Sequence, residues 1–222
     1  MSYNRNCMKK NILSLLLLCA ALSASAQDIT LPAPDMSQKS MSVVEALKTR
    51  HSSREFAGKE LDNQQLSNLC WAACGVSRDD NHRTSPTARN LQEIRLFAFT
   101  KSGVYEYDAK GNKLVKKADG DHRALMASNG PGAGFKQEFV MDAPVTLLMV
   151  IDFEKYGSHD DNAIRMGCVD AGNVSENINL YCQAVGLVTV PRATHDADGI
   201  RKLLGFTDKQ LPIMNNPVGY AK

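Results

Sequence analysis

The sequence predicts one domain of the α+β class, in which helices accompany a single central sheet. Residues 93–100 alternate apolar with polar side chains, and residues 145–151 form a continuous apolar run; both patterns are typical of strands. Residues 170–185 instead carry apolar residues at helical spacing. Once an N-terminal segment of 26 residues is set aside, 196 of the 222 residues remain, a length that suits a single core.

Local signals place the other elements. Ser42 can cap a first helix, and Glu45 follows three residues later, as in a capping box. Asp62 can cap a second helix that ends near Gly75. The apolar stripe of the first helix would consist of Val43, Val44 and Leu47. The remaining elements are expected to be a hairpin over residues 104–107 and 113–115, a strand over 187–190, a short helix over 196–204 and a closing segment over 212–220.

The first 26 residues have the order of a secretory signal peptide. Lys9 and Lys10 precede an apolar run over residues 12–22, and Ala24-Ser25-Ala26 offers the small residues that signal peptidase reads. The run is too short to span a bilayer, so we expect no stable membrane anchor; a buried N-terminal helix is the alternative. We expect an exported protein, periplasmic or secreted, with a cleaved Sec signal over residues 1–26, an extended leader over 27–41 and a folded domain over 42–222.

Removal of the signal changes the charge of the chain. Arg5, Lys9 and Lys10 account for three of the 26 basic residues, so 23 remain against 24 acidic ones. The mature chain is therefore close to neutral. It has no basic tail or cluster, which argues against binding to nucleic acid.

Four cysteines remain after that cleavage: Cys70, Cys74, Cys168 and Cys182. An exported chain can oxidise such residues, but buried thiols are the commoner outcome in a chain that is long enough to fold without cross-links. Cys70 and Cys74 share one face of a helix, and a metal site there would need a histidine at matching spacing. The sequence offers none nearby, so we expect no metal.

Other conspicuous residues have structural explanations. Trp71 has apolar neighbours on its helix and is expected in the core. The glycine-rich segment 130–134 lacks the Lys-Ser/Thr pair that follows in a P-loop, so a turn or a flexible lid is expected. Surface positions are expected for His82, His122, His159 and His195.

The most informative polar cluster follows the first helix. Arg50, Ser52 and Arg54 place two guanidinium groups and a hydroxyl within one compact turn. Arginine offers forked donors that match phosphate oxygens, and serine adds a short donor that can reach the same group. A solvated charged turn is the alternative.

The sequence Arg-His-Ser-x-Arg-x-Phe over residues 50–56 resembles the opening signature of the nitroreductase family. The resemblance implies a mainly antiparallel sheet flanked by helices, an intertwined homodimer and one FMN at each shared site. It assigns Arg50, Ser52 and Arg54 to the phosphate end of FMN and gives His51 backbone or ring contacts. Six further stretches in family order extend the resemblance to about residues 42–220.

Two of those stretches bear on the cofactor. Residues 83–88 resemble the family's Pro-Ser-Ala loop, which reaches the flavin of the partner subunit, and Thr87 keeps the hydroxyl of the usual serine. After Pro191 the family points backbone N–H groups at the flavin, and here the side chain of Arg192 could add a cation. The resemblance thus adds to the cofactor site Pro86, Thr87, Ala88, Asn90, Gln137, Pro191, Arg192 and Ala193.

Residues 103–108, Gly-Val-Tyr-Glu-Tyr-Asp, resemble a hairpin of one branch of the family, the thiazoline and oxazoline dehydrogenases of peptide-toxin maturation. A basic pair that often follows the last strand in the family has only Lys222 as a counterpart, which suggests weaker phosphate binding.

The resemblance therefore implies an FMN-dependent oxidoreductase with ping-pong electron transfer to a small-molecule acceptor. No acid–base side chain is obligatory, because the cofactor carries the hydride chemistry, and we assign no catalytic residue. Two alternatives stay open: a flavin- or ligand-binding module without turnover, and an oxidase that acts on a peptide.

We predict that the natural protein begins near Gln27 and lies outside the cytoplasm, because a signal peptidase site follows the apolar run. N-terminal sequencing of natively expressed protein checks this. Recovery of Met1 on cytoplasmic protein would contradict it.

Overall fold

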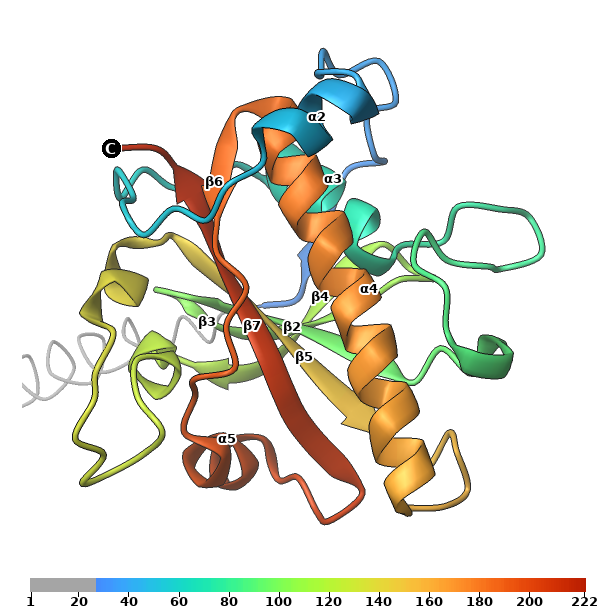
Figure 1. The fold of residues 1–222 in the computed structure, drawn as a ribbon, viewed down its shortest axis with the longest axis vertical. Coiled ribbons are helices and arrows are strands. Elements are labelled where there is room, and N and C mark those ends of the chain that lie inside the picture. Colours follow the sequence, from blue (N-terminus) through green and yellow to red (C-terminus); the bar gives the residue numbers. More distant parts are fainter. Residues whose placement is uncertain (1–26) are drawn as a thin grey trace, which may run out of the picture.

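The computed structural model describes residues 27–222, which form one antiparallel sheet with helices on both faces (Figure 1). The predicted signal peptide lies outside the described residues. The strands lie in the order β1-β4-β3-β2-β5-β7-β6, and every neighbouring pair is antiparallel. The predicted α+β class is confirmed.

The strands are β1 (Ile29–Thr30), β2 (Ile94–Thr100), β3 (Gly103–Asp108), β4 (Lys113–Asp119), β5 (Val145–Asp152), β6 (Leu187–Thr189) and β7 (Gln210–Tyr220). The α-helices are α2 (Val43–Thr49), α3 (Asn63–Cys74), α4 (Asp161–Val185) and α5 (Ala197–Leu204). Three short 3-10 helices are η1 (Ala88–Asn90), η2 (Arg123–Met126) and η3 (Glu138–Asp142).

Strand β5 is the centre of the molecule, and every one of its residues is buried. Its successive side chains face opposite layers, as the two-residue period of a strand requires. Leu147 belongs to the apolar cluster that includes Ile178 of α4, whereas Leu148 belongs to the cluster that includes Ile200 of α5. The prediction of a strand buried on both faces is therefore confirmed.

The helix termini follow the capping signals in the sequence. Ser42 and Glu45 form a reciprocal capping box at the start of α2, and Asp62 does the same at the start of α3. Gly186 ends α4 with φ of 78°, a left-handed conformation that glycine adopts without strain.

Helix α4 begins at Asp161, nine residues before the predicted start. The apolar pattern did not reveal this first part because only Ala163 and Gly167 are buried among residues 161–169. The Asp160 side chain caps the helix by accepting from Ala163 N at 2.8 Å. A Cβ at Gly167 would lie 2.7 Å from Ile151, so glycine permits the close approach of α4 to β5.

The expected apolar stripe of α2 does not face the core. Val43, Val44 and Leu47 are 69%, 74% and 58% exposed, and Ala46 is the buried residue of the helix. The helix lies across the end of α4 (Figure 1) and packs through Ala46, so its larger apolar side chains point away from this chain.

Part of residues 27–41, the expected leader, joins the sheet as β1. Ile29 pairs with Leu114 of β4, and Leu31 is buried. Pro32 O then accepts hydrogen bonds from Ser67 Oγ at 2.6 Å and from Asn112 Nδ2 at 2.7 Å. Residues 27–32 therefore belong to the folded body of the molecule.

The remaining expectations are met in part. Cys70, Cys74 and Cys182 are buried free thiols, whereas Cys168 is exposed. Trp71 is half-buried, with its indole N–H donating to Val76 O at 2.9 Å. The surface position expected for His195 is wrong, because that side chain is buried beside β7. Within residues 27–222, no helix is long and apolar enough to cross a membrane.

Candidate cofactor site

The segment after α2 carries the residues predicted to bind a phosphate. Arg50 closes the helix by donating its backbone N–H to Ala46 O at 2.8 Å. The chain then turns and runs beside β6, where Ser53 N donates to Thr189 O at 3.0 Å. Backbone hydrogen bonds therefore fix the segment 50–57 to the end of the sheet.

The polar side chains of this segment are accessible. Arg50 is half-buried, and His51, Ser52 and Arg54 are exposed. Phe56, by contrast, is 3% exposed and anchors the segment in the core. The result is a rigid backbone that presents two guanidinium groups and a hydroxyl outward.

Arg192 belongs to the same region, but its guanidinium is buried, with 7% of the residue exposed. Nε donates to Gln137 Oε1 at 2.5 Å, Nη1 to Asn215 Oδ1 at 2.7 Å and Nη2 to Met126 O at 2.8 Å. All three acceptors are neutral. The side chain is thus held between β7 and residues 126–137, and it is not free to swing over a ligand.

Two positive charges lie close together in this region. The pKa of Arg192 is lowered to about 10, chiefly by burial and secondly by the charge of Arg54. None of Arg50, Arg54 and Arg192 pairs with a carboxylate of residues 27–222. A group of cations without a counter-ion favours an anionic ligand, and a phosphate-bearing cofactor such as FMN fits this donor set.

The backbone N–H groups after Pro191 were expected to point at the flavin, and for one of them this expectation is wrong. The Arg192 N–H donates to Asn215 O at 2.8 Å, and Asn215 N donates back to Arg192 O at 2.7 Å. This exchange occupies the Arg192 N–H, so that group is not a donor to a flavin. The Ala193 N–H makes no hydrogen bond within the described chain, and Pro191 and Ala193 are exposed.

Two side chains from the segment before β5 complete the region. The Phe139 ring centroid lies 6.4 Å from that of Phe56 and 5.5 Å from the Arg192 guanidinium. Gln137 is half-buried, and its Oε1 is already used by Arg192. One chain therefore brings together the predicted residues at 50–54, 137 and 191–193.

The remaining predicted residues, Pro86, Thr87, Ala88 and Asn90, lie elsewhere. Their loop is held against the middle of α4, where Ala88 N donates to Asp170 Oδ2 at 2.7 Å. In Figure 1 this loop and the segment 50–57 lie on opposite sides of the molecule, with α4 between them. A single chain does not place these residues beside the Arg50–Arg54 cluster.

The Gly-Val-Tyr hairpin motif has structural roles in this fold. A Cβ at Gly103 would lie 2.6 Å from Ala118 O, so the turn into β3 requires glycine. Tyr105 is buried, and Asp108 accepts from the backbone N–H groups of Lys110 and Gly111 in the following turn. Packing and turn geometry account for this motif without a ligand.

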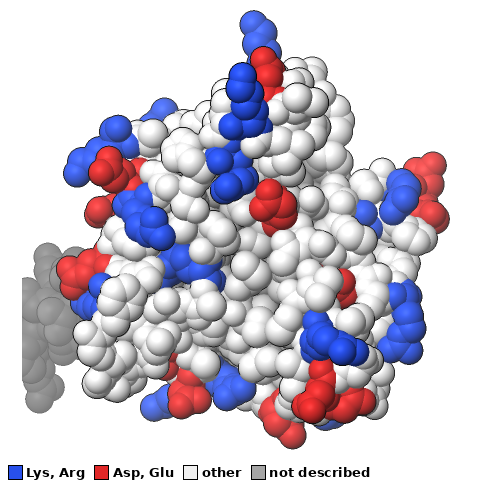
Figure 2. Space-filling model, in the orientation of Figure 1, with Lys and Arg blue, Asp and Glu red and all other residues white. Residues whose placement is uncertain are grey.

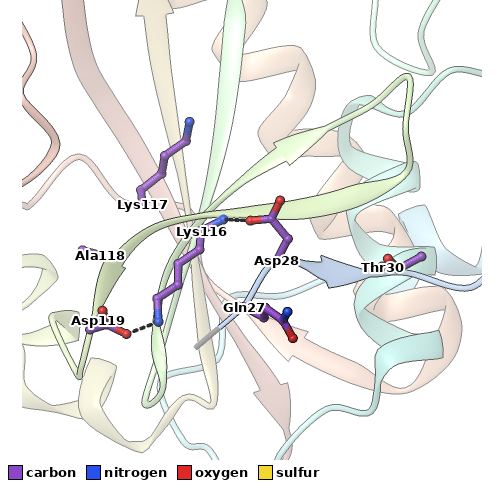
Figure 3. Close-up of a pocket in the computed structure, with 7 residues that line it drawn as sticks. All are labelled: Gln27, Asp28, Thr30, Lys116, Lys117, Ala118 and Asp119. Atoms are coloured by element: carbon purple, nitrogen blue, oxygen red, sulfur yellow. Dashed lines mark hydrogen bonds and ion pairs between the residues drawn. The ribbon is translucent and has the colours of Figure 1, made fainter. Parts of the chain in front are cut away.

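A hollow of about 700 Å³ lies at the opposite edge of the sheet, beside β1 and β4 (Figure 3). Its charged groups have partners: Lys116 Nζ pairs with Asp119, the backbone N–H of Lys116 donates to Asp28 Oδ1 at 2.9 Å, and Lys117 Nζ pairs with Glu106 at 2.8 Å. None of the predicted cofactor residues lines it. We therefore do not regard this hollow as the cofactor site.

The sequence analysis missed Asn215 and Asn216 of β7, which are fully buried. Asn215 holds Arg192, whereas Asn216 Oδ1 accepts from Ser175 Oγ at 2.8 Å and its Nδ2 donates to Asn179 Oδ1 at 2.9 Å. Asparagine is depleted in strands, so two in succession within an expected strand were the available signal.

Comparison with known proteins identifies the family of this chain. The profile of the nitroreductase family matches residues 47–220. A Methanocaldococcus jannaschii protein named for the nitroreductases is 26% identical over 198 residues, which cover 84% of this chain and 93% of that protein.

Solved structures show the same fold. A Ralstonia eutropha protein, also named for the nitroreductases, has a TM-score of 0.80 and 29% identity, over 91% of this chain and 93% of that one. A chain of the Escherichia coli microcin synthetase complex, solved with truncated pro-MccB17 bound, has a TM-score of 0.62 and 18% identity, over 85% of this chain and 77% of that one. From the profile match, the relatives and the fold together, this chain belongs to the nitroreductase family.

Proposed function

We propose that this protein is an exported, FMN-dependent oxidoreductase in which a donor and then an acceptor use one flavin site in turn. The observation that carries the proposal is the group of cations at Arg50, Arg54 and Arg192, which has no carboxylate partner in residues 27–222. Membership in the nitroreductase family supports an oxidoreductase.

Different residues of the chain would bind different parts of FMN. Arg50, Ser52 and Arg54 would hold the phosphate, because their side chains are accessible on a fixed backbone. The unused N–H of Ala193 would donate to the flavin edge and stabilise negative charge there. FMN, when bound, supplies the hydride and electron transfer.

Arg192 has a different role from the one that its sequence position suggests. Its three neutral hydrogen-bond acceptors leave its positive charge uncompensated while fixing its position. It would therefore act through its field on the neighbouring anion, and through its contacts by holding residues 137 and 215 in place.

A homodimer would complete the site. The loop at residues 86–90 lies across the molecule from the Arg50–Arg54 cluster, so a second copy is needed to bring the two together. Two features support such an interface: the exposed Val43, Val44 and Leu47 of α2, and the largely uncharged centre of the face seen in Figure 2.

A peptide substrate is the second candidate. It is favoured by the fold shared with the microcin synthetase chain, whose complex was solved with a peptide precursor bound. The Gly-Val-Tyr hairpin does not separate the two candidates, because its residues have packing roles. Flavin-dependent oxidation of a thiazoline-containing peptide by the purified protein would support the peptide candidate.

We predict that Arg50→Ala combined with Arg54→Ala weakens FMN binding by at least about a hundredfold, because each charge-assisted contact contributes roughly 1.5–3 kcal/mol. Titration of FMN into apo protein by flavin fluorescence measures this at moderate salt. The matched control is Arg78→Ala with Arg165→Ala, which removes the same charge elsewhere. Equal losses in the two double variants would show that the effect is one of net charge alone.

We predict that the protein is an obligate homodimer that loses FMN when it dissociates. Val44→Lys with Leu47→Lys places charge on the exposed apolar face of α2 and should yield monomers without flavin, although Arg50 and Arg54 are intact. Lys48→Glu, on an exposed position of the same helix, should remain dimeric. Light scattering and flavin content across a dilution series give the measurement, and a stable monomer with stoichiometric FMN would refute the shared site.

A further inference from the structure

Residues 86–92 form a loop whose two ends are fixed to the body of the molecule. Before the loop, Thr84 N donates to Gly75 O at 2.9 Å, and Thr84 Oγ1 donates to Trp71 O at 3.0 Å. After the loop, Ile94 begins the paired strand β2. The conformation of the chain between these two ends therefore depends on the contacts of the loop itself.

The backbone of this loop is strained at exposed positions. Arg89, Asn90 and Gln92 have φ values of 53°, 55° and 53°, in the left-handed region that residues other than glycine rarely adopt, although asparagine adopts it more readily than the other two. Arg89 and Asn90 are exposed, so burial of their own side chains does not offset the strain. Strain of this kind persists only where the surrounding structure fixes it, and it is concentrated at functional sites.

Hydrogen bonds within the loop close its turns. Asn90 N donates to Thr87 O at 3.0 Å, and Gln92 N donates to Thr87 Oγ1 at 3.0 Å. The Gln92 side chain also donates to Asn81 O at 2.9 Å, in the polar stretch before the loop. None of these three bonds reaches α4, the helix against which the loop lies.

Asp170 supplies the link between the loop and α4. Its Oδ2 accepts from Ala88 N at 2.7 Å, although the two residues lie 82 positions apart in the sequence. Asp170 is 5% exposed, and its neighbours Ala171 and Val174 on the same helix belong to the core. A hydrogen bond from an amide to a carboxylate is stronger than one between neutral groups, and a buried carboxyl oxygen needs such a donor.

The helix α4 supports both parts that the proposed cofactor site requires. Asp170 holds the loop near the middle of this helix of 25 residues, and near its end Ala184 O accepts from Met41 N at 2.9 Å, just before α2. In Figure 1, α4 lies between the loop and the segment 50–57. Movement of the loop relative to α4 would therefore change its position relative to the Arg50–Arg54 cluster and leave that cluster itself unchanged.

We propose that Asp170 is the positioning residue for residues 86–92, and that its hydrogen bond with Ala88 N keeps the loop in the strained shape in which it enters the cofactor site of the second subunit. The last step rests on the proposed function, because only that function gives the loop a flavin to reach. The loop and the helix belong to one chain, so the positioning itself is measurable without cofactor.

Amide hydrogen exchange in the flavin-free protein tests the positioning. The reporters are the N–H groups of Asn90 and Gln92, because their acceptors lie within the loop and remain when the bond to Asp170 is removed. Asp170→Leu, which removes the acceptor, should lower both protection factors by about tenfold or more, the loss expected for a charge-assisted hydrogen bond. Asp170→Asn should restore most of the protection, because its side-chain carbonyl still accepts.

Two further variants separate positioning from general stability. Glycine adopts a positive φ without strain, so Arg89→Gly added to Asp170→Leu should recover roughly fivefold of the protection lost at Asn90. The control is Ile178→Ala, which removes a fully buried side chain further along α4 and lowers the global stability. In the control, exchange of the two loop amides by local opening should be unchanged.

Unchanged protection of Asn90 and Gln92 in a folded Asp170→Leu variant, or an equal loss in Ile178→Ala, would overturn the proposal. If Asp170→Leu does not fold, as judged by circular dichroism, Asp170→Ala carries the same test, because it also removes the acceptor.

Titration with FMN tests the link to the cofactor site. Asp170→Leu should bind FMN at least about tenfold more weakly than the unaltered protein, although Arg50 and Arg54 are intact. Unchanged affinity in a variant whose loop has lost protection would overturn that link. An unaltered protein that binds no FMN but shows the expected exchange results would refute the proposed function and leave the positioning by Asp170 standing.

Discussion

The guanidinium of Arg192 is buried without a carboxylate partner, and much of the candidate site depends on how this charge is accommodated. A buried charge is costly unless hydrogen bonds satisfy it. Here β7, the segment before β5 and the Met126 carbonyl each supply one neutral acceptor. One side chain therefore holds the three segments in place relative to one another. Its charge has no carboxylate partner and lies near that of Arg54.

Strand β7 is the element that makes this arrangement possible. Its successive residues Asn215 and Asn216 point to opposite faces, as strand geometry dictates. Asn215 fixes Arg192 and the backbone of residues 192–194, whereas Asn216 links α4 to β6 through Asn179 and Thr189. A fully satisfied buried network of this kind specifies one packing of the helix on the sheet. The cation cluster at one end of the sheet thus has a rigid base.

Much of the fold could be predicted from local signals. The capping box at Ser42, the cap at Asp62 and the uninterrupted apolar run of β5 each depend on a few adjacent residues, and all three were identified correctly. The start of α4 was not identified, because its first turns are largely exposed to solvent and their sequence shows no apolar periodicity. The apolar stripe of α2 was identified, but it does not face the core of this chain. Periodicity shows that one face of a helix is apolar, but not which molecule covers that face.

The site was only partly predictable for a similar reason. The motif at residues 50–54 identified side chains that can bind phosphate, and the fold brings residues 137 and 191–193 to them. The occupation of the Arg192 N–H by Asn215 joins residues that lie 23 positions apart in the sequence. Such contacts depend on strand register and helix packing, which no local pattern encodes.

The proposed function requires that the uncompensated cations bind a flavin phosphate in a working oxidoreductase. The absorption spectrum of the purified mature protein, recorded before and after addition of dithionite, tests it most directly. We predict flavin bands at one FMN per chain that bleach on reduction and return when an acceptor is added. Protein that stays colourless after incubation with FMN, or bound flavin that no reductant bleaches, would contradict it.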